Sequence, residues 1–181
     1  MVTTLRNLVV LLVAVVFAPM AQAADDPIAL SDDTKTLVAL LDPISGPPVT
    51  PEGLDGKVVV VTFFASWCPP CHTEFTHLNE LYEAYHDQGV EIIAINRFEQ
   101  AGRFEDGGER LAAFIATYEP AFSVVAGNDA VAAAFGNVAR IPTVLVFDRD
   151  GASALHFIHV RDSGVTNPKP EEVIAAIQSS L

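Results

Sequence analysis

Two cysteines, Cys68 and Cys71, are the residues of this 181-residue chain whose type and spacing are best suited to chemistry. Cysteines three positions apart can close and open a disulfide ring. The largely apolar run 58–64 before them predicts a buried strand, and the helix-period pattern of residues 69–88 predicts a helix after them. A helix N-terminus carries partial positive charge, which stabilises a thiolate on the first sulfur. The pair therefore predicts thiol–disulfide exchange, with Cys68 as the exposed nucleophile and Cys71, one turn deeper, as the resolving thiol.

A zinc half-site is the alternative use of such a pair. Zinc usually takes four ligands, commonly from two pairs of this kind. The chain has no further cysteine, and its five histidines are scattered. We therefore expect no metal at the pair, and no structural disulfide elsewhere.

The two residues between the cysteines are Pro69 and Pro70. Neither has a backbone N–H group, and both restrict the loop. We expect them to tune the reduction potential of the pair. His72, directly after the pair, is interpreted as a solvated helix residue rather than as part of the redox site.

Glu74 is the nearest carboxyl to the pair along the chain. It lies three residues after Cys71 and so shares one helix face with it. If the carboxyl is buried, desolvation and a nearby thiolate raise its pKa. The alternative is a surface glutamate in the first turns of a helix, where its charge suits the helix dipole.

The elements that must position these residues follow from periodicity and from turn residues. Residues 43–56 hold four prolines and three glycines, which predicts an extended connector. The helix that starts at Ser31 is expected to place Leu37, Val38, Leu40 and Leu41 inside. The further elements are strands at 58–64, 90–95, 123–125, 143–147 and 155–160, helices at 69–88, 109–118 and 170–181, a brief helix ending at residue 136, and a polar loop at 96–108 that is a candidate neighbour of the active site.

The first 23 residues predict a secretory signal peptide. A short start with one positive charge precedes the apolar run 8–18, and Ala21-Gln22-Ala23 supplies small residues for cleavage. The apolar run is shorter than the ~20 residues of a membrane-spanning helix, which disfavours the alternative of an uncleaved anchor. We expect export with cleavage after Ala23, to the periplasm if the source is Gram-negative, and a soluble mature protein.

The charge of the chain is strongly acidic, with 23 Asp and Glu against 10 Lys and Arg, a formal net charge of −13. No basic stripe occurs along the sequence. We therefore expect neither nucleic-acid binding nor docking to anionic lipid.

Three phrases resemble the thioredoxin superfamily, and within it the exported, membrane-associated thiol reductases of the TlpA and ResA type. They are GKVVVVTFFASWCPPC at residues 56–71, GVEIIAIN at 89–96, and Ile141-Pro142-Thr143. The resemblance covers residues 55–181 and implies an α/β thioredoxin-like fold, with a central mixed β-sheet flanked by helices. We expect a signal peptide at 1–23, an N-terminal extension with a short helix and connector at 24–54, and a thioredoxin-like domain at 55–181.

The resemblance also implies roles around the pair. Thioredoxin has an aspartate on the strand before its cysteines, at the place of Thr62, which cannot take a proton; in the TlpA and ResA type, a glutamate at the place of Glu74 is the acid–base group. The Ile141–Pro142 bond is expected to be cis and to face the cysteines, where the backbone of Ile141 pairs with substrate. Trp67 is expected to flank and cover Cys68, with ordinary core packing as the alternative.

Together these features predict an exported thiol–disulfide oxidoreductase that mainly reduces disulfides of other exported proteins, with the haem-site cysteines of apocytochrome c as candidate substrates. Pro70, where strongly oxidising relatives often have histidine, resembles the reducing branch. The sequence has no nucleotide-binding motif, so we expect a membrane thiol electron donor and no cofactor beyond the disulfide of Cys68 and Cys71.

Three alternatives stay open. An oxidase or isomerase of the same fold would differ in reduction potential. A peroxiredoxin-like peroxidase would use one cysteine without a partner three residues on. A copper-handling module could use His156 and His159, although their spacing is wrong and both methionines lie within the predicted signal peptide.

Overall fold

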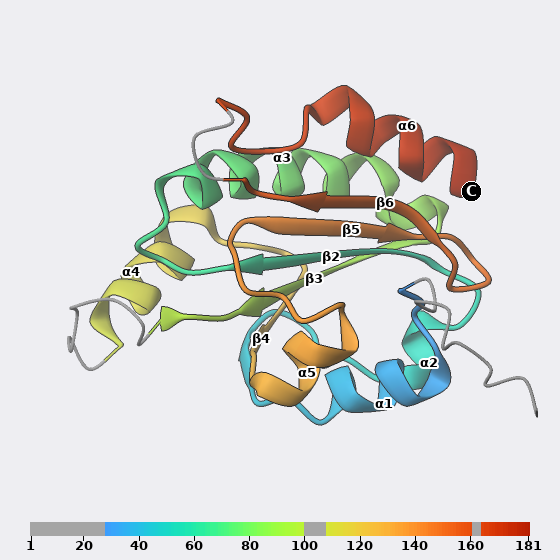
Figure 1. The fold of residues 1–181 in the computed structure, drawn as a ribbon, viewed down its shortest axis with the longest axis horizontal. Coiled ribbons are helices and arrows are strands. Elements are labelled where there is room, and N and C mark those ends of the chain that lie inside the picture. Colours follow the sequence, from blue (N-terminus) through green and yellow to red (C-terminus); the bar gives the residue numbers. More distant parts are fainter. Residues whose placement is uncertain (1–27, 100–107, 161–163) are drawn as a thin grey trace, which may run out of the picture.

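The computed structural model describes residues 28–99, 108–160 and 164–181. Its strands are β1 Pro43–Ser45, β2 Val58–Phe64, β3 Val90–Asn96, β4 Ser123–Ala126, β5 Thr143–Phe147 and β6 Ser153–Ile158. They form one six-stranded sheet in the order β1-β4-β3-β2-β5-β6 (Figure 1). The pairs β2–β3 and β3–β4 are parallel, and the other three pairs are antiparallel. The expected central mixed sheet is confirmed.

The helices are α1 Asp32–Ala39, α2 Pro51–Leu54, α3 Pro69–Tyr85, α4 Glu109–Tyr118, α5 Asp129–Ala134 and α6 Pro170–Ser180. They cover both faces of the sheet (Figure 1). Side chains of α3, α4 and α6 belong to the core on one face, and those of α1, α2 and α5 to the core on the other. None of these helices combines the length and apolar character needed to cross a membrane, and the predicted signal peptide lies outside the described residues.

Strand β2 lies in the middle of the sheet, and all seven of its residues are buried. Because side chains of a strand alternate between faces, Val60 and Phe64 enter the core under α3, while Val61 and Phe63 enter the opposite core. A strand covered on both faces needs a nearly continuous apolar sequence. Thr62 is the polar exception, and its hydroxyl faces α3.

Aromatic packing fixes α3 above this strand. The ring centroid of Phe75 lies 4.6 Å from that of Phe64 and 4.7 Å from that of Phe114 in α4. Phe75 has no exposed surface, so a short side chain there would open a cavity beneath the active-site helix. The helix is followed by a 3-10 turn, His86–Gln88, and by Gly89 with φ 92°, close to the predicted end.

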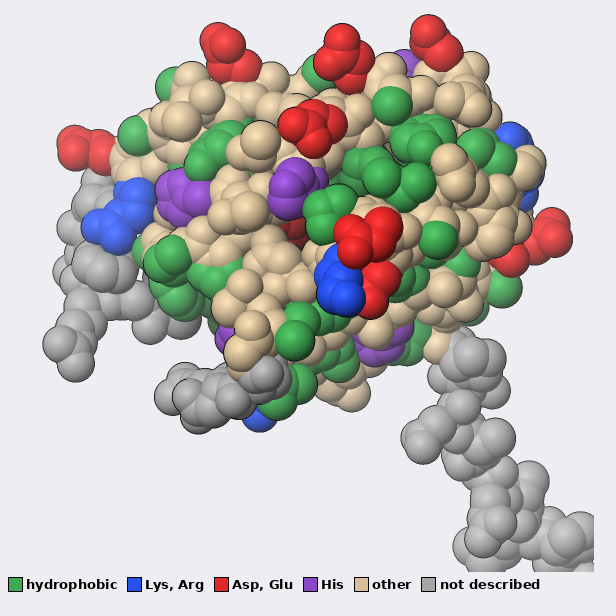
Figure 2. Space-filling model, turned by 90° about the horizontal axis from the view of Figure 1, so that it is seen from above, with side chains coloured by type: hydrophobic (Ala, Val, Ile, Leu, Met, Phe, Trp, Pro, Cys, Tyr) green, Lys and Arg blue, Asp and Glu red, His purple; other side chains and the backbone are tan. Residues whose placement is uncertain are grey.

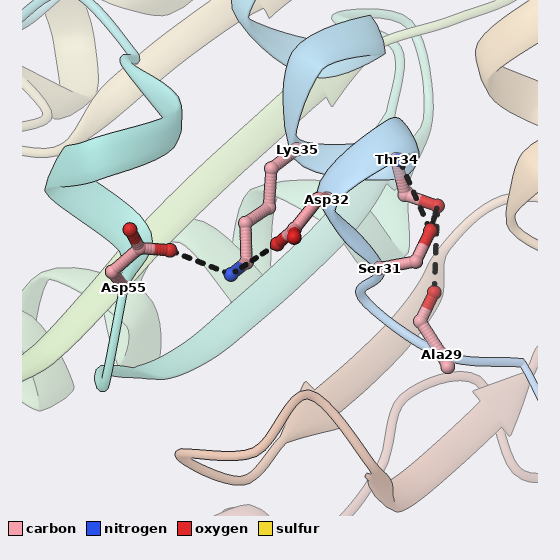
Figure 3. A network of polar contacts seen from close by, with 6 residues as sticks. All are labelled: Ala29, Ser31, Asp32, Thr34, Lys35 and Asp55. Carbon is pink, nitrogen blue, oxygen red and sulfur yellow. Dashed lines mark hydrogen bonds and ion pairs between the residues drawn. The ribbon is translucent and has the colours of Figure 1, made fainter.

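The segment before β2 is attached to the face opposite α3. The Ser31 hydroxyl accepts a hydrogen bond from the Thr34 N–H at 3.2 Å and so caps α1. Lys35 donates to Asp32 at 3.2 Å and to Asp55 at 2.7 Å, which joins α1 to the residue after α2 (Figure 3). The hydrogen bond to Asp55 is the main cause of the raised pKa of Lys35.

Three sequence predictions about elements were wrong. The connector predicted at 43–56 contains β1, which pairs with β4 at the sheet edge, and α2. Leu40, expected inside, is 77% exposed, because it follows the last helical residue and only Val38 and Leu41 point fully inward. The last strand covers Ser153–Ile158 rather than the predicted 155–160. The division of the chain after residue 54 stays a prediction, although β1 is part of the sheet.

Candidate active site

Cys68 and Cys71 form a disulfide, with their Cα atoms 5.4 Å apart. Cys68 is the N-cap of α3, and its carbonyl accepts the Cys71 N–H at 3.0 Å. Pro69 and Pro70 occupy the first helical positions, where a backbone N–H has no intrahelical partner, so two prolines start the helix without losing a bond. A thiolate formed on Cys68 therefore lies at the positive end of a 17-residue helix.

The expected exposure of Cys68 is wrong for this disulfide form. Cys68 is 3% exposed and Cys71 is fully buried. The sulfur of Cys68 is bonded to the buried Cys71, and Cys68 is one of the residues that line a groove. A substrate must enter this groove to reach it.

The groove has a volume of about 530 Å³. Its walls bring together the expected Trp67 and Ile141 with Cys68. The lining residues are Trp67, Cys68, Pro69, Pro70, Phe98, Ala139, Arg140, Ile141 and His159. The Ile141–Pro142 bond is cis, as expected, but Pro142 itself is buried and is not one of the residues that line the groove. Phe98, Arg140 and His159 were not anticipated in this role.

The chain directly after β3 packs against the active-site turn. The indole N–H of Trp67 donates to the Phe98 carbonyl at 3.0 Å. The Glu99 carboxylate accepts the Ser66 N–H at 2.9 Å, the Ser66 hydroxyl, and the Asn96 side-chain amide at 2.8 Å. The start of the polar loop thus lies at the active site, whereas residues 100–107 are outside the described residues. The parallel strands β2 and β3 end at the same edge of the sheet. Applied to the sequence, this rule would have predicted that the residues after Asn96 lie next to the active-site turn.

Phe98 has an unusual backbone. Its φ of 68° is in the left-handed region, which a bulky side chain rarely adopts. The two hydrogen-bonded neighbours, Trp67 and Glu99, hold the chain in this conformation. The result is an aromatic side chain aimed into the groove, at a place where strain often accompanies function.

The interpretation of His72 as a solvated residue is wrong. His72 is half-buried, with its Nε2 2.9 Å from the Ser66 carbonyl oxygen and its Nδ1 2.9 Å from the Tyr118 hydroxyl. Because a carbonyl only accepts, Nε2 carries a hydrogen, and in the neutral ring Nδ1 accepts from Tyr118. His72 therefore fastens the active-site turn to α4. The sequence held no signal for this, since Tyr118 is 46 residues away.

Glu74 lies inside the protein, which is the buried alternative of the two that the sequence left open. It is 4% exposed, and its Oε1 accepts the Thr62 hydroxyl at 2.5 Å. Desolvation raises the pKa of Glu74 to about 8, although the Thr62 hydrogen bond acts to lower it. Glu74 follows Cys71 on the buried face of α3, so a carboxyl that can hold or release a proton near neutral pH stands one turn behind the disulfide. Thr62, excluded as a proton acceptor, instead orients this carboxyl.

Metal ligands are not assembled at this site. Within residues 28–99, 108–160 and 164–181, no three His, Cys, Asp or Glu side chains are grouped to hold a metal ion. His159 lines the groove, but His156 does not. The described site offers a disulfide, a buried carboxyl and an apolar groove, which are the parts that thiol–disulfide exchange requires.

Comparison with known proteins gives the same chemistry. The AhpC/TSA family matches residues 37–152. The thiol-disulfide oxidoreductase ResA of Halalkalibacterium halodurans is 31% identical over 140 residues, which cover 77% of this chain and 73% of that protein. ResA of Geobacillus thermodenitrificans is 38% identical over 96 residues, 53% of this chain and about half (51%) of the relative.

Solved structures support the fold. A secreted disulfide oxidoreductase of Mycobacterium tuberculosis, homologous to E. coli DsbE, has a TM-score of 0.62 at 21% identity, with 82% of this chain and 99% of that chain covered. A thioredoxin-family thiol:disulfide interchange protein from Chlorobium tepidum has a TM-score of 0.59 at 20% identity, with 77% and 94% covered. From the family match, the ResA identity and the disulfide at the head of α3, we conclude that this chain belongs to the AhpC/TSA family, has a thioredoxin-like fold, and is a thiol–disulfide oxidoreductase.

Proposed function

We propose that the protein is an exported reductant, which passes two electrons from the Cys68–Cys71 dithiol to disulfides of other exported proteins. The observation that supports this best is the buried Glu74, bonded to Thr62 and placed one turn behind Cys71. Export rests on the predicted signal peptide. Apocytochrome c cysteines are the candidate substrate, and a membrane thiol protein is the candidate electron donor.

The first step is attack by Cys68. Its thiolate, favoured by the N-terminus of α3, forms a bond with one sulfur of the substrate disulfide. The substrate S–S bond breaks, and the other substrate sulfur leaves as a thiolate. The groove fits this step, because the apolar walls given by Trp67, Phe98 and Ile141 can cover an extended chain segment next to the reacting sulfur.

The second step releases the substrate. The Cys71 thiol gives its proton to the Glu74 carboxylate, because the thiolate is the nucleophile. The Cys71 thiolate then bonds to the Cys68 sulfur, the mixed disulfide breaks, and the second substrate sulfur leaves as a thiolate. The substrate has gained two electrons, and the enzyme holds the disulfide.

Re-reduction runs the same steps backwards. A donor thiolate attacks Cys68, and Cys71 becomes the leaving thiolate. With a pKa of about 8, Glu74 in the disulfide form is mostly protonated at pH 7, so it can return the proton to Cys71. One carboxyl therefore acts as a base in one direction and as an acid in the other.

The direction of electron flow is tested by the reduction potential of the pair. Neither Pro69 nor Pro70 can donate an N–H to a thiolate, which leaves the reduced form with less stabilisation and favours a reductant. Equilibration with a dithiol buffer should give a potential near that of thioredoxin, about −270 mV. A potential near −120 mV would instead assign the protein to the oxidases.

Trapping tests the roles of the two cysteines. Cys71→Ala should accumulate mixed disulfides through Cys68, and Cys68→Ala should accumulate none, because Cys71 is buried behind it. Mass spectrometry of the trapped adducts also identifies the substrates. Adducts of equal yield in both variants would remove the assigned order of attack.

A further inference from the structure

Arg97 contacts both Phe98, which lines the groove, and the start of α5, but it does not line the groove itself. Its guanidinium carbon lies over the Phe98 ring, 4.6 Å from the ring centroid. Nη2 of the same guanidinium forms an ion pair with Asp129, the first residue of α5. A guanidinium binds both the face of an aromatic ring and a carboxylate, so this one side chain links the ring to the helix.

The chain around Arg97 is closely packed. Its backbone N–H donates to the Phe64 carbonyl at 2.7 Å, and the Gly127 N–H donates to the Asn96 carbonyl at 2.8 Å. A Cβ atom at Gly127 would lie 2.6 Å from Cγ2 of Ile95 and 3.5 Å from Cδ of Arg97. Glycine therefore lets the chain after β4 approach the end of β3. The Arg97 side chain is only 23% exposed, so its stem packs on this segment rather than extending into solvent.

Helix α5 is a fixed anchor for this link. Its residues Val131 and Phe135 have no exposed surface and belong to the core on the face opposite α3 (Figure 1). The side-chain oxygen of Asn128 accepts the Val131 N–H at 2.9 Å and caps the helix. The chain then passes through the buried Val138 to residues 139–141, which also line the groove. Phe98 is thus linked through Arg97 to the element that leads into a second segment of the groove wall.

We propose that Arg97 is a positioning residue for substrate binding, which holds the Phe98 ring in the groove wall through a guanidinium anchored on Asp129. The inference rests on the proposed function, in which the groove receives the substrate chain. A ring that is already held in place loses less conformational freedom when the substrate binds, so it contributes more to affinity. Loss of the anchor should therefore weaken substrate binding and leave the chemistry of the two cysteines unchanged.

The first test compares Arg97→Ala with Asp129→Ala on an acidic disulfide peptide. Arg97→Ala should raise KM about five-fold, because both the ring contact and the ion pair are lost, while kcat and the reduction potential stay at their wild-type values. Asp129→Ala should raise KM about two-fold, since the carboxylate of this ion pair is 96% exposed. The two substitutions change the net charge in opposite senses. An effect of overall charge would move KM in opposite directions and would overturn the proposal, whereas loss of positioning raises KM in both variants.

A double substitution tests whether Arg97 acts through the ring. In a Phe98→Ala background, Arg97→Ala should cause no further rise in KM, because the ring that it positions is gone. Additive effects of the two substitutions would mean that Arg97 acts on the substrate by another route, and the proposal would be wrong. Arg97→Lys keeps the charge but lacks the planar guanidinium, so it should raise KM about two-fold. This variant replaces Arg97→Ala if the alanine protein does not fold.

The ring itself gives a readout without substrate, by ¹⁹F NMR of the protein with a fluorine label on the Phe98 ring. Arg97→Ala and Asp129→Ala should each shift and broaden this resonance, and an unchanged resonance would overturn the proposal. The KM of Phe98→Ala separates the two levels of the argument. If Phe98→Ala raises KM but Arg97→Ala does not, this inference fails while the proposed function stands. If neither substitution changes KM, the groove is not the substrate site, and that part of the proposed function fails together with the inference.

Discussion

Glu74 ties the stability of the fold to pH in the sense opposite to that of an ordinary salt-bridged carboxyl. Its pKa rises from 4.5 to about 8 on folding, because the carboxyl is taken out of water. Between these two values the folded protein binds more protons than the unfolded chain, so this group's contribution to stability falls as pH rises. The contribution is complete below about pH 4.5 and is lost as pH rises towards 8.

Glu74→Gln should therefore be increasingly more stable than the wild type as pH rises from 5 to 8.5. The amide keeps an acceptor for Thr62 and removes the buried charge. The expected gain at the upper end is a few kcal/mol, since each unit of pKa shift is about 1.4 kcal/mol. Urea unfolding of both proteins across this range gives the difference directly. Parallel stability curves would mean that Glu74 ionises freely in the folded state.

Thr62→Val should shift the pH dependence of catalysis upwards. The Thr62 hydroxyl is the hydrogen bond that lowers the pKa of Glu74, and valine has the same shape without it. Resolution of the mixed disulfide should then reach its plateau at a higher pH than in the wild type, as followed by stopped-flow. Thr62→Ser, which retains the hydroxyl, is the matched control and should keep the wild-type profile.

The start of the loop after β3 forms part of the active site as well as connecting two elements of the fold. Residues 96–99 turn the backbone through the left-handed Phe98 and present its ring to the groove. Hydrogen bonds from Trp67 and Ser66 fix this segment on the active-site turn. The wall of the groove therefore comes from a different strand end than the cysteines.

Phe98→Ala should weaken substrate binding more than it changes the chemistry. The substitution removes apolar surface from the groove but changes neither the cysteines nor Glu74, so KM for a disulfide peptide should rise about ten-fold while the reduction potential stays at the wild-type value. Phe98→Leu should retain most of the affinity. A shifted potential with an unchanged KM would place Phe98 in the redox chemistry instead.

The sequence alone was enough to predict the helices and strands that have strong periodic patterns. The order from β2 through α3 to β3, the start of α3 at Pro69 and its end near Gly89 all follow from apolar runs and breakers. The three-residue β1 gave no such signal, because a strand that short has no measurable period and is stabilised by β4, far along the chain. The same reason applies in the site, where spacing indicated Glu74 but not the contact between His72 and Tyr118, 46 residues apart.

The whole molecule carries its charge unevenly. The face over α3 and α6 shows acidic side chains in separate spots (Figure 2). The groove is different, because none of the described residues that line it is acidic, whereas Arg140 and His159 line it. An acidic residue beside the substrate cysteine would meet a cation there, in a chain of net charge −13.

Arg140→Ala should lower kcat/KM for a disulfide peptide with a glutamate beside its cysteine by up to about five-fold, the scale of an exposed ion pair. The matched control is Arg149→Ala, which changes the net charge equally. Arg149 lies in the turn after β5, where its guanidinium donates to carbonyls of Gly56, Gln88 and Leu181. An equal fall in both variants would trace the effect to the overall field rather than to the groove, and added salt should reduce the difference.

Ser66 has a consequence for how the two redox states meet their partners. Its N–H and hydroxyl are bound by Glu99 and its carbonyl by His72, so all its polar groups are engaged and none depends on a cysteine sulfur. Opening the disulfide breaks none of these bonds, so we expect the backbone at Ser66 to keep its conformation in both redox states. The proposed electron donor and the proposed substrate would then meet the same backbone at this turn.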